Sequence, residues 1–317
     1  MGGGLRVLYL GGLGRSGSTL LERLLGELPD VVPLGEVVHM WQRGIAENER
    51  CGCGLEFARC DFWSQVGKTA FGGWEKVDAQ RISDLRAAID RIRFIPRLAG
   101  HELSARTRQR LTEYTDYYLR TYEAVSEMTG AAALVDSSKH ASLAFCLSRR
   151  PEIDLRVIHL VRDSRAVAYS WAKRVARPDA SGETYMTKYP PVRAAAQWNA
   201  ENYALQVLGR RRAPVLRIRY EDLVRSPEQT VLAVSEFAGL DVDETALGFL
   251  GTDGDSRMAV LREAHTASGN PMRFATGRVS ILGDERWRAG MPGSHRRTVT
   301  AMTLPLLARY GYLGRPA

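Results

Sequence analysis

A glycine-rich segment near the start of the chain has the composition of an anion-binding loop. It reads Gly-Leu-Gly-Arg-Ser-Gly-Ser-Thr at residues 12–19, between an apolar run at 5–11 and leucines at helical spacing in 18–28. A strand, a glycine turn and a helix start in this order gather backbone N–H groups around one point, where the helix dipole adds partial positive charge. The segment therefore predicts a cradle for phosphate or sulfate.

This loop lacks the lysine found in the phosphate-binding loop of nucleoside triphosphatases. That pattern needs Gly-x4-Gly-Lys-Ser/Thr; Gly12 and Gly17 keep the spacing, but Ser18 takes the lysine position and Arg15 is the cation inside the loop. A P-loop kinase or NTPase stays open as an alternative, with Asp136 at a strand end as its Mg²⁺ ligand. A second alternative is a nucleotide- or anion-binding module without catalysis.

A second cation follows a strongly apolar strand. Residues 155–161 read Leu-Arg-Val-Ile-His-Leu-Val and lead into Arg162, and Ser170 comes eight residues later. In a helix expected from about residue 164 to 175, two turns bring Ser170 back to the face on which Arg162 lies. A charge-assisted bond to phosphate contributes about 1.5–3 kcal/mol, so this pair is suited to a second anion.

Charged side chains follow two further short strands. Glu36 comes just after the strand expected at residues 31–34, and Lys139 closes Asp-Ser-Ser-Lys after the strand expected at 132–135. Transfer of a group to a hydroxyl needs a base for that hydroxyl and charge that stabilises the leaving group. A carboxylate and an ammonium group are of the types that perform these two tasks.

Two histidines compete for the role of base. His140 stands directly beside Lys139 and is as good a candidate for the scaffold as for the site. His159 lies within the apolar strand, so we expect it in the core.

Three of the four cysteines lie close together. Cys51, Cys53 and Cys60 form Cys-Gly-Cys-Gly-x5-Cys, whereas Cys146 stands alone in an apolar run. Three thiols can bind zinc with a fourth ligand such as His39, can form one disulfide, or can stay reduced, and a reducing cytosol disfavours the disulfide. Because the spacing matches no established zinc pattern, we expect reduced thiols that shape an acceptor-side loop and no metal.

The elements that must position these residues alternate between strands and helices. The expected strands lie at 5–11, 31–34, 132–135, 155–161 and 215–218, and the expected helices at 18–28, 78–95, 106–128, 164–175, 227 onward and 298–309. This alternation predicts one α/β domain over residues 1–317, with a central parallel sheet flanked by helices. Residues 43–75, rich in Gly, Cys and aromatics without a period, are expected to form an irregular insertion.

Composition excludes several classes of protein. The chain has 317 residues, 44% hydrophobic and 25% charged, which suits a globular domain. No run approaches 18 apolar residues, so we expect no membrane-spanning helix, and residues 1–4 lack the features of a secretory signal. We therefore expect a cytoplasmic protein, and the oligomeric state stays open.

Positive charge is concentrated at the end of the chain. The net charge is +8, and the last 61 residues hold ten Arg and three acids. Such a surface suits nucleic acid, an anionic small molecule or simply solvent. Together with the anion loop, it favours an anionic small molecule, and we expect no nucleic-acid partner.

Taken together, these motifs resemble the PAPS-dependent sulfotransferases, which transfer a sulfuryl group from 3′-phosphoadenylyl sulfate (PAPS) to a hydroxyl and release PAP. Arg-Ser-Gly-Ser-Thr at residues 15–19 fits their 5′-phosphosulfate loop, and its style is closest to tyrosylprotein-type and bacterial members. The resemblance extends from residue 5 to about 312. It implies the P-loop-like sulfotransferase fold.

The resemblance also implies which residues hold PAPS. Arg162 and Ser170 match the pair that binds the 3′-phosphate, and Arg278 matches a cation of the C-terminal segment that closes over it. No divalent metal is required. The loop residues implied for the 5′-phosphate and sulfate are Gly14, Arg15, Ser16, Gly17, Ser18 and Thr19.

Catalytic roles follow from the same resemblance. Glu36 matches the general base of the tyrosylprotein enzymes, and Lys139 matches a lysine aimed at the sulfate and the bridging oxygen, where Arg15 adds charge. The acceptor itself is not identified by the sequence. We expect its contacts at residues 40–130 and 176–190, and a small molecule such as a natural product is favoured over a peptide.

Overall fold

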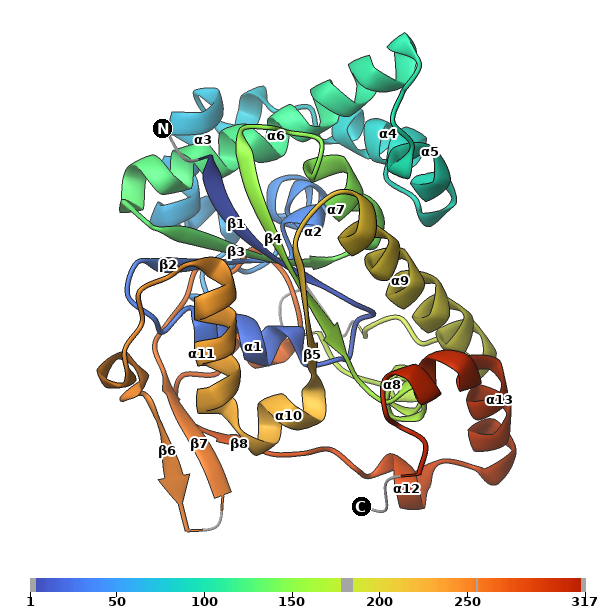
Figure 1. Ribbon diagram of the computed structural model, residues 1–317. Coiled ribbons are helices and arrows are strands. Elements are labelled where there is room, and N and C mark those ends of the chain that lie inside the picture. The colour runs from blue at the N-terminus through green and yellow to red at the C-terminus, as the bar shows by residue number, and fades with distance from the viewer. Residues whose placement is uncertain (1–3, 178–184, 255, 315–317) are drawn as a thin grey trace.

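A parallel sheet of five strands lies at the centre of the fold (Figure 1). The computed structural model describes residues 4–177, 185–254 and 256–314. The strand order is β2-β3-β1-β4-β5, and the four neighbouring pairs are all parallel. The strands are β1 (Leu5–Gly11), β2 (Val31–Gly35), β3 (Ala133–Lys139), β4 (Ile153–Val161) and β5 (Val215–Arg219). The expected α/β class with a central parallel sheet is confirmed.

Strand β1 occupies the middle of the sheet because both of its faces are apolar. Leu8 and Leu10 pack toward one face, while Val7 and Tyr9 pack toward the other, and all four are fully buried. Side chains alternate between the two faces of a strand, so helices must cover both sides of this sheet.

Helices α1, α10 and α11 cover the face of Leu8, and α6, α7 and α9 cover the face of Val7 (Figure 1). In the ranges that the structure describes, no helix has the length and apolar character to cross a bilayer. The α-helices are α1 (Ser18–Leu25), α2 (Val37–His39), α3 (Asp61–Phe71), α4 (Ala79–Ile89), α5 (Ile95–Ala99), α6 (Ala105–Thr129), α7 (Ala141–Leu147), α8 (Ser164–Ala172), α9 (Pro191–Arg211), α10 (Tyr220–Arg225), α11 (Pro227–Ala238), α12 (Trp287–Gly290) and α13 (Gly293–Arg309).

The expectation that residues 43–75 are irregular is wrong for much of this segment. Helix α3 lies within it, and a π-helical turn (Met40–Ala46) leads into it. Trp63, Val66 and Ala70 recur at helical spacing and are buried, but the glycines and cysteines around them hide this period in the sequence.

A small antiparallel sheet near the C-terminus was not expected from the sequence. Its order is β6-β7-β8, with β6 (Leu250–Asp253), β7 (Ser256–Leu261) and β8 (Gly277–Ile281). These strands are short, and they bury Ala259, Leu261 and Ile281 against the cluster that contains α1 and α11. Tertiary packing therefore stabilises strands whose own sequence signal is weak.

Candidate anion-binding and transfer site

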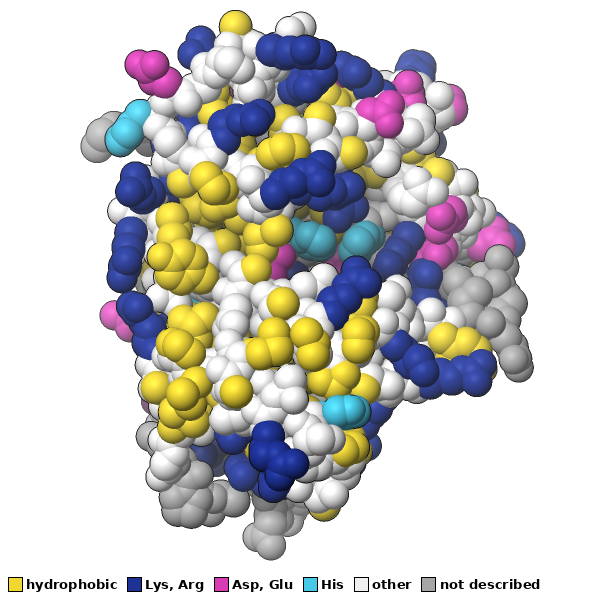
Figure 2. All heavy atoms as spheres, turned by 90° about the vertical axis from the view of Figure 1, so that its right-hand side faces the viewer, with side chains coloured by type: hydrophobic (Ala, Val, Ile, Leu, Met, Phe, Trp, Pro, Cys, Tyr) yellow, Lys and Arg dark blue, Asp and Glu magenta, His cyan; other side chains and the backbone are white. Residues whose placement is uncertain are grey.

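A pocket of about 700 Å³ lies at the edge of the sheet where β1, β2, β3 and β4 end. Ligands of open α/β sheets bind at this edge. Figure 2 shows a hollow with histidine and acidic side chains inside it, bordered by Lys and Arg on one side and by hydrophobic side chains on the other. The predicted site residues that line the pocket are Gly14, Arg15, Gly17, Ser18, Thr19, Glu36, Lys139, Arg162 and Ser170.

Two glycines allow the loop between β1 and α1 to turn tightly. Gly12 has φ of 140°, and a Cβ there would lie 2.4 Å from the carbonyl oxygen of Leu160. Gly17 has φ of 93°, and a Cβ there would lie 2.5 Å from the ring of Tyr220. Both positions therefore require glycine, and the second one places the N-terminus of α1 at the pocket.

Ser16 has a different role from the other loop residues. Its hydroxyl donates to the carbonyl oxygen of Leu13 at 2.7 Å, and the side chain does not line the pocket. We conclude that Ser16 braces the loop from within, and its side chain is turned away from the space where a ligand would bind.

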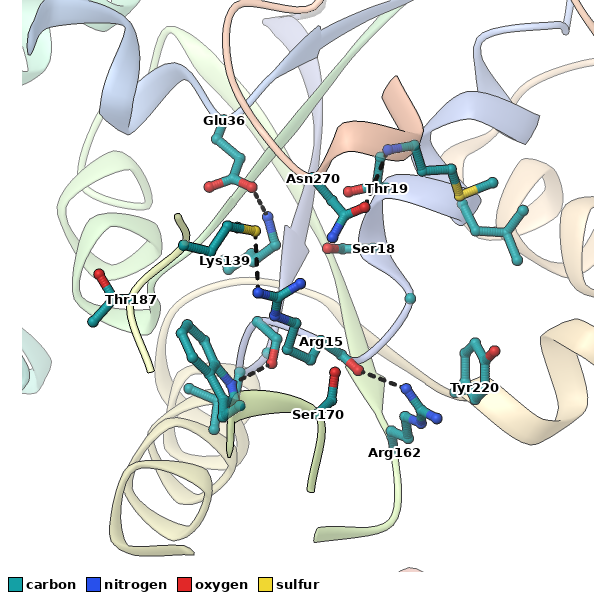
Figure 3. A pocket seen from close by; sticks show the side chains of 18 of the residues that line it. Arg15, Ser18, Thr19, Glu36, Lys139, Arg162, Ser170, Thr187, Tyr220 and Asn270 are labelled. Carbon is teal, nitrogen blue, oxygen red and sulfur yellow. Dashed lines mark hydrogen bonds and ion pairs between the residues drawn. The ribbon is translucent and has the colours of Figure 1, made fainter. Parts of the chain in front are cut away.

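Arg15 lies at the centre of the pocket with few partners of its own (Figure 3). One terminal nitrogen donates to the Met186 sulfur at 3.0 Å, and the guanidinium stacks 5.3 Å from the Trp171 ring centre. The buried Nε has no acceptor among the residues that the structure describes. Burial lowers the pKa of Arg15, and the charge of Glu36 opposes this effect. A buried guanidinium beside a weak sulfur acceptor is well suited to bind an incoming anion.

Glu36 and Lys139 meet in the same pocket (Figure 3). The Lys139 ammonium group donates to Glu36 Oε1 at 2.5 Å and to the carbonyl oxygen of Ser137 at 3.1 Å. Burial alone would raise the pKa of Glu36, but the charge and the hydrogen bond of Lys139, with help from Arg43, outweigh it and lower that pKa. Glu36 is therefore a carboxylate held beside a cation.

The three histidines considered so far differ in environment. His39 Nε2 lies 3.6 Å from Glu36 Oε2, and His140 lines the same pocket with its ring 6.0 Å from that of His39. Burial lowers the pKa of His140 to about 4, so its imidazole is neutral near pH 7. His159 bonds Asn202 at 2.7 Å and is 1% exposed, as expected for a core residue.

Arg162 joins the anion loop to the C-terminal segment. Its terminal nitrogens donate to the carbonyl oxygens of Arg15 at 3.0 Å and Asp284 at 2.8 Å, and it stacks on the Tyr220 ring at 4.4 Å. Ser170 lines the same part of the pocket (Figure 3). The spacing of eight residues thus brings both side chains to one site.

A sequence profile of the Sulfotransferase family matches residues 8–244, a range that contains the loop, Glu36, Lys139, Arg162 and Ser170. The chain belongs to the sulfotransferase family. Human carbohydrate sulfotransferase 3 is 30% identical over 183 residues, which cover 52% of this chain and 35% of that protein. Human carbohydrate sulfotransferase 2 is 29% identical over 162 residues, covering 38% and 30% respectively.

The chain spans about a third of the length of these curated relatives. Among solved structures, the sulfotransferase domain from the Synechococcus PCC 7002 olefin synthase superposes with a TM-score of 0.53 at 18% identity. That match covers 100% of this chain and 98% of the other. It confirms the P-loop-like sulfotransferase fold.

Arg278, expected to close over the 3′-phosphate, is exposed on β8 and is absent from the residues that line the pocket. Ser280, two residues further along the same strand, lines it. Side chains two apart on a strand share a face and lie about 6.6 Å apart along it, so Arg278 lies next to the residue that lines the pocket. Arg286 is the cation of this segment that lines the pocket.

Asp136 is placed for support and not for holding a metal ion. It is fully buried, and it accepts hydrogen bonds from the hydroxyls of Tyr122 and Ser138, both at 2.5 Å. Burial raises its pKa to about 6. The carboxylate is therefore occupied within the core of the fold, which leaves the kinase alternative without its Mg²⁺ ligand.

Glu22 is a site-supporting residue that the sequence analysis missed. It is 1% exposed on α1, and its two oxygens accept from the Gly35 amide at 2.6 Å and from the Ser137 hydroxyl at 2.8 Å. It thus ties together the two strand ends that carry Glu36 and Lys139. Its position within the leucine repeat of α1 was the available signal, because a carboxylate on an apolar helix face needs buried partners.

Other pocket residues come from segments without a recognisable motif. They contribute aromatic rings, amides and charges around the loop: Trp171, Tyr189, Gln197, Glu201, Tyr220, Asn270 and Asp284. Acceptor contacts were expected at 176–190, of which residues 178–184 lie outside the described part of the chain. Tyr185, Met186 and Thr187 do line the pocket.

Proposed function

We propose that this sulfotransferase moves a sulfuryl group from PAPS to a hydroxyl of a small acceptor, with the whole chain acting as one sulfotransferase domain in the cytoplasm. The observation that carries the proposal is the meeting of Glu36, Lys139 and Arg15 in one pocket at the N-terminus of α1. A carboxylate, an ammonium group and a guanidinium beside an anion cradle supply the charges that sulfuryl transfer needs.

PAPS would lie across the two anion sites. The loop amides, Ser18, Thr19 and Arg15 would hold the 5′-phosphate and sulfate. Arg162 and Ser170 would hold the 3′-phosphate. Nη1 of Arg162 carries a second N–H beyond the one given to the Arg15 carbonyl oxygen, and the phosphate would compete with the Asp284 carboxylate, 3.6 Å from Nη2, for this guanidinium. Arg286 is a further pocket cation at this end.

The transfer step uses Glu36 as general base. The acceptor oxygen attacks sulfur as Glu36 takes its proton, and the bond from sulfur to the bridging oxygen breaks. The leaving electron pair stays on the 5′-phosphate of PAP, where Arg15, Lys139 and the loop amides stabilise it. The sulfate attracts Lys139 away from Glu36, which releases the carboxylate from its ion pair at the moment it must accept a proton.

The acceptor would share the pocket with the nucleotide. The pocket volume of about 700 Å³ suits a nucleotide together with a small molecule or a chain end. The names of two relatives specify carbohydrate as their substrate class. Sugar hydroxyls are therefore the first acceptors to test, followed by natural-product alcohols and phenols, with a tyrosine peptide as the comparison.

Transfer of ³⁵S from labelled PAPS to this acceptor panel tests the proposal directly. We expect labelled product and an equal amount of PAP with at least one hydroxyl acceptor, and none with Glu36→Gln beyond a small residual rate. A panel that gives no product, while PAP still binds tightly, would favour the non-catalytic binding module.

The kinase alternative is separated by ligand binding. We expect PAP to raise the Tm of the protein without added Mg²⁺, because arginines and amides neutralise its phosphates. ATP should raise the Tm much less, with or without Mg²⁺. A larger shift with ATP–Mg²⁺ than with PAP would overturn the assignment of PAPS as donor.

A further inference from the structure

Three cysteines and one histidine converge outside the proposed active site. Within the described part of the chain, the ligand atoms of Cys51, Cys53, Cys60 and His265 all lie within 4.8 Å of one another. The cysteines come from the turn before α3, and the histidine comes from the segment between β7 and β8. His39, the fourth ligand considered from the sequence, lies instead beside Glu36.

The spacing of these atoms matches the edges of a metal-centred tetrahedron. Zn–S bonds of about 2.3 Å and Zn–N bonds of about 2.0–2.1 Å give edges of about 3.5–3.8 Å. The Cys53 and Cys60 sulfurs are 3.8 Å apart, and His265 Nδ1 lies 3.3 Å from the Cys60 sulfur and 3.9 Å from that of Cys51. All four cysteines of the chain are free thiols, so no disulfide competes for these sulfurs.

Backbone hydrogen bonds fix the turn that carries Cys51 and Cys53. The Cys51 amide donates to the Leu55 carbonyl oxygen at 2.8 Å. Gly54 has φ of 86° and donates its amide to the carbonyl of Cys51 at 2.9 Å, which closes the turn. Such outer hydrogen bonds orient metal ligands.

We propose that Cys51, Cys53, Cys60 and His265 Nδ1 bind one Zn²⁺ ion in a closed, structural site. Thiolate and imidazole are the ligands that zinc prefers in a tetrahedral Cys3His set, and four protein ligands leave no position for water. Binding releases up to three thiol protons as the sulfurs become ligands. This proposal departs from the expectation of metal-free thiols, which rested on spacing without His265.

The zinc ion would join two distant parts of the chain behind the transfer site. Two hydrogen bonds join the same parts of the chain. The Gly52 amide donates to the Thr266 carbonyl oxygen at 2.9 Å, and Trp63 Nε1 donates to the His265 carbonyl oxygen at 2.8 Å. The segment tethered in this way continues to Ser268, whose carbonyl accepts the Glu36 amide at 3.1 Å. Zinc would therefore stabilise the support of Glu36 without touching the substrate.

Metal analysis of the full chain tests the proposal. The protein is purified in reducing buffer without chelators, and metals are measured by elemental analysis and native mass spectrometry. We expect one zinc per chain. Protein stripped of metal should bind Co²⁺ with the absorption bands of tetrahedral thiolate coordination, and X-ray absorption at the zinc edge should fit three sulfurs and one nitrogen.

Variants locate the ion. Loss of a group that only hydrogen-bonds to a metal ligand typically weakens metal binding by about 10–100-fold. Cys53→Ser and His265→Gln each remove a ligand itself, so each should weaken Zn²⁺ binding by more than this. Cys146→Ala is the matched control, since it removes a buried thiol outside the cluster and should keep one zinc. If either ligand variant does not fold, the cobalt spectrum of the natural protein still decides.

Four results would overturn the zinc site. The natural protein could neither contain zinc nor bind it after reduction, or it could contain iron in place of zinc. The three cysteines could form a disulfide in reducing buffer, or Cys53→Ser could keep one full equivalent of zinc with unchanged affinity. None of these readouts depends on sulfuryl transfer, so the zinc site and the proposed function can fail independently.

Discussion

The Lys139 ammonium group donates a hydrogen bond to Glu36 Oε1 at 2.5 Å, with both side chains largely shielded from solvent. The two groups proposed to drive catalysis therefore neutralise each other in the free protein. On the proposed function, an arriving sulfate would compete for Lys139, so donor binding and activation of the base would be coupled. In the free protein the ion pair leaves neither of these shielded charges without a partner.

Replacing the proposed base should remove turnover but leave nucleotide binding in place. We expect Glu36→Gln to lower kcat by about 10²–10⁴-fold, the usual contribution of a general base. PAP affinity should change little, because Glu36 would not touch the phosphates. Steady-state kinetics with ³⁵S-labelled PAPS and calorimetry with PAP measure the two quantities.

Glu236→Gln on the exposed surface of α11 is the matched control and should behave as the natural protein. Near-normal turnover of Glu36→Gln with the true acceptor would place the base elsewhere. His140, which lines the same pocket, is then the next residue to substitute.

The acid limb of the pH–rate profile should depend on Lys139. Lys139 lowers the pKa of Glu36, so kcat/KM should fall only below the ordinary glutamate pKa of about 4.3. In Lys139→Ala, burial acts without this opposing charge, and the limb should move to higher pH. The rate plateau should also drop by about 10²–10³-fold, as for loss of a charge-stabilising donor.

Lys68→Ala on the exposed side of α3 controls for loss of a lysine and should leave the profile unchanged. A limb at the same pH in Lys139→Ala and the natural protein would show that the ion pair does not set the basicity of Glu36.

Arg162 should discriminate between ligands with and without a 3′-phosphate. We expect Arg162→Ala to weaken PAP by about 1.5–3 kcal/mol, the value of a charge-assisted bond. Adenosine 5′-phosphosulfate, which lacks that phosphate, should lose much less. Calorimetric titration of both ligands measures the difference. Arg225→Ala is the control, because the Arg225 side chain is 70% exposed. Equal losses for the two ligands would contradict this assignment.

Glu22 should make stability depend on pH. Burial raises the pKa of Glu22 to about 7, so the folded protein holds a proton that the unfolded chain loses above about pH 4.3. This contribution to stability is complete below pH 4.3 and is lost as the pH rises through 7. It amounts to at most about 4 kcal/mol.

Glu22→Gln isolates this effect, since an amide can still accept from the Gly35 amide and donate to Ser137 but does not ionise. We expect the variant to gain stability relative to the natural protein as pH rises from 5 to 8. Denaturant unfolding at several pH values measures the difference, with Glu236→Gln as control. Parallel pH profiles for Glu22→Gln and the natural protein would contradict the raised pKa.

Local features of the sequence predicted the central sheet and much of the pocket. The runs that became β1 and β4 are apolar on both faces, and the glycines between β1 and α1 meet backbone demands that other residues cannot meet. Strand ends in a parallel sheet meet at one edge, so Glu36, Lys139 and Arg162 converge once the strand order is set. Family membership could be inferred because these motifs are short and local.

Other features arose only from contacts between segments far apart in the chain. Glu22 accepts hydrogen bonds from Gly35 and Ser137 that no spacing encodes, and on β8 it is Ser280, rather than Arg278, that lines the pocket. Cys60 and His265 are 205 residues apart, yet their ligand atoms lie 3.3 Å from one another. Local periodicity determines which elements form, whereas the burial of charges and the pairing of ligands depend on how those elements pack, and only the tertiary structure decides that.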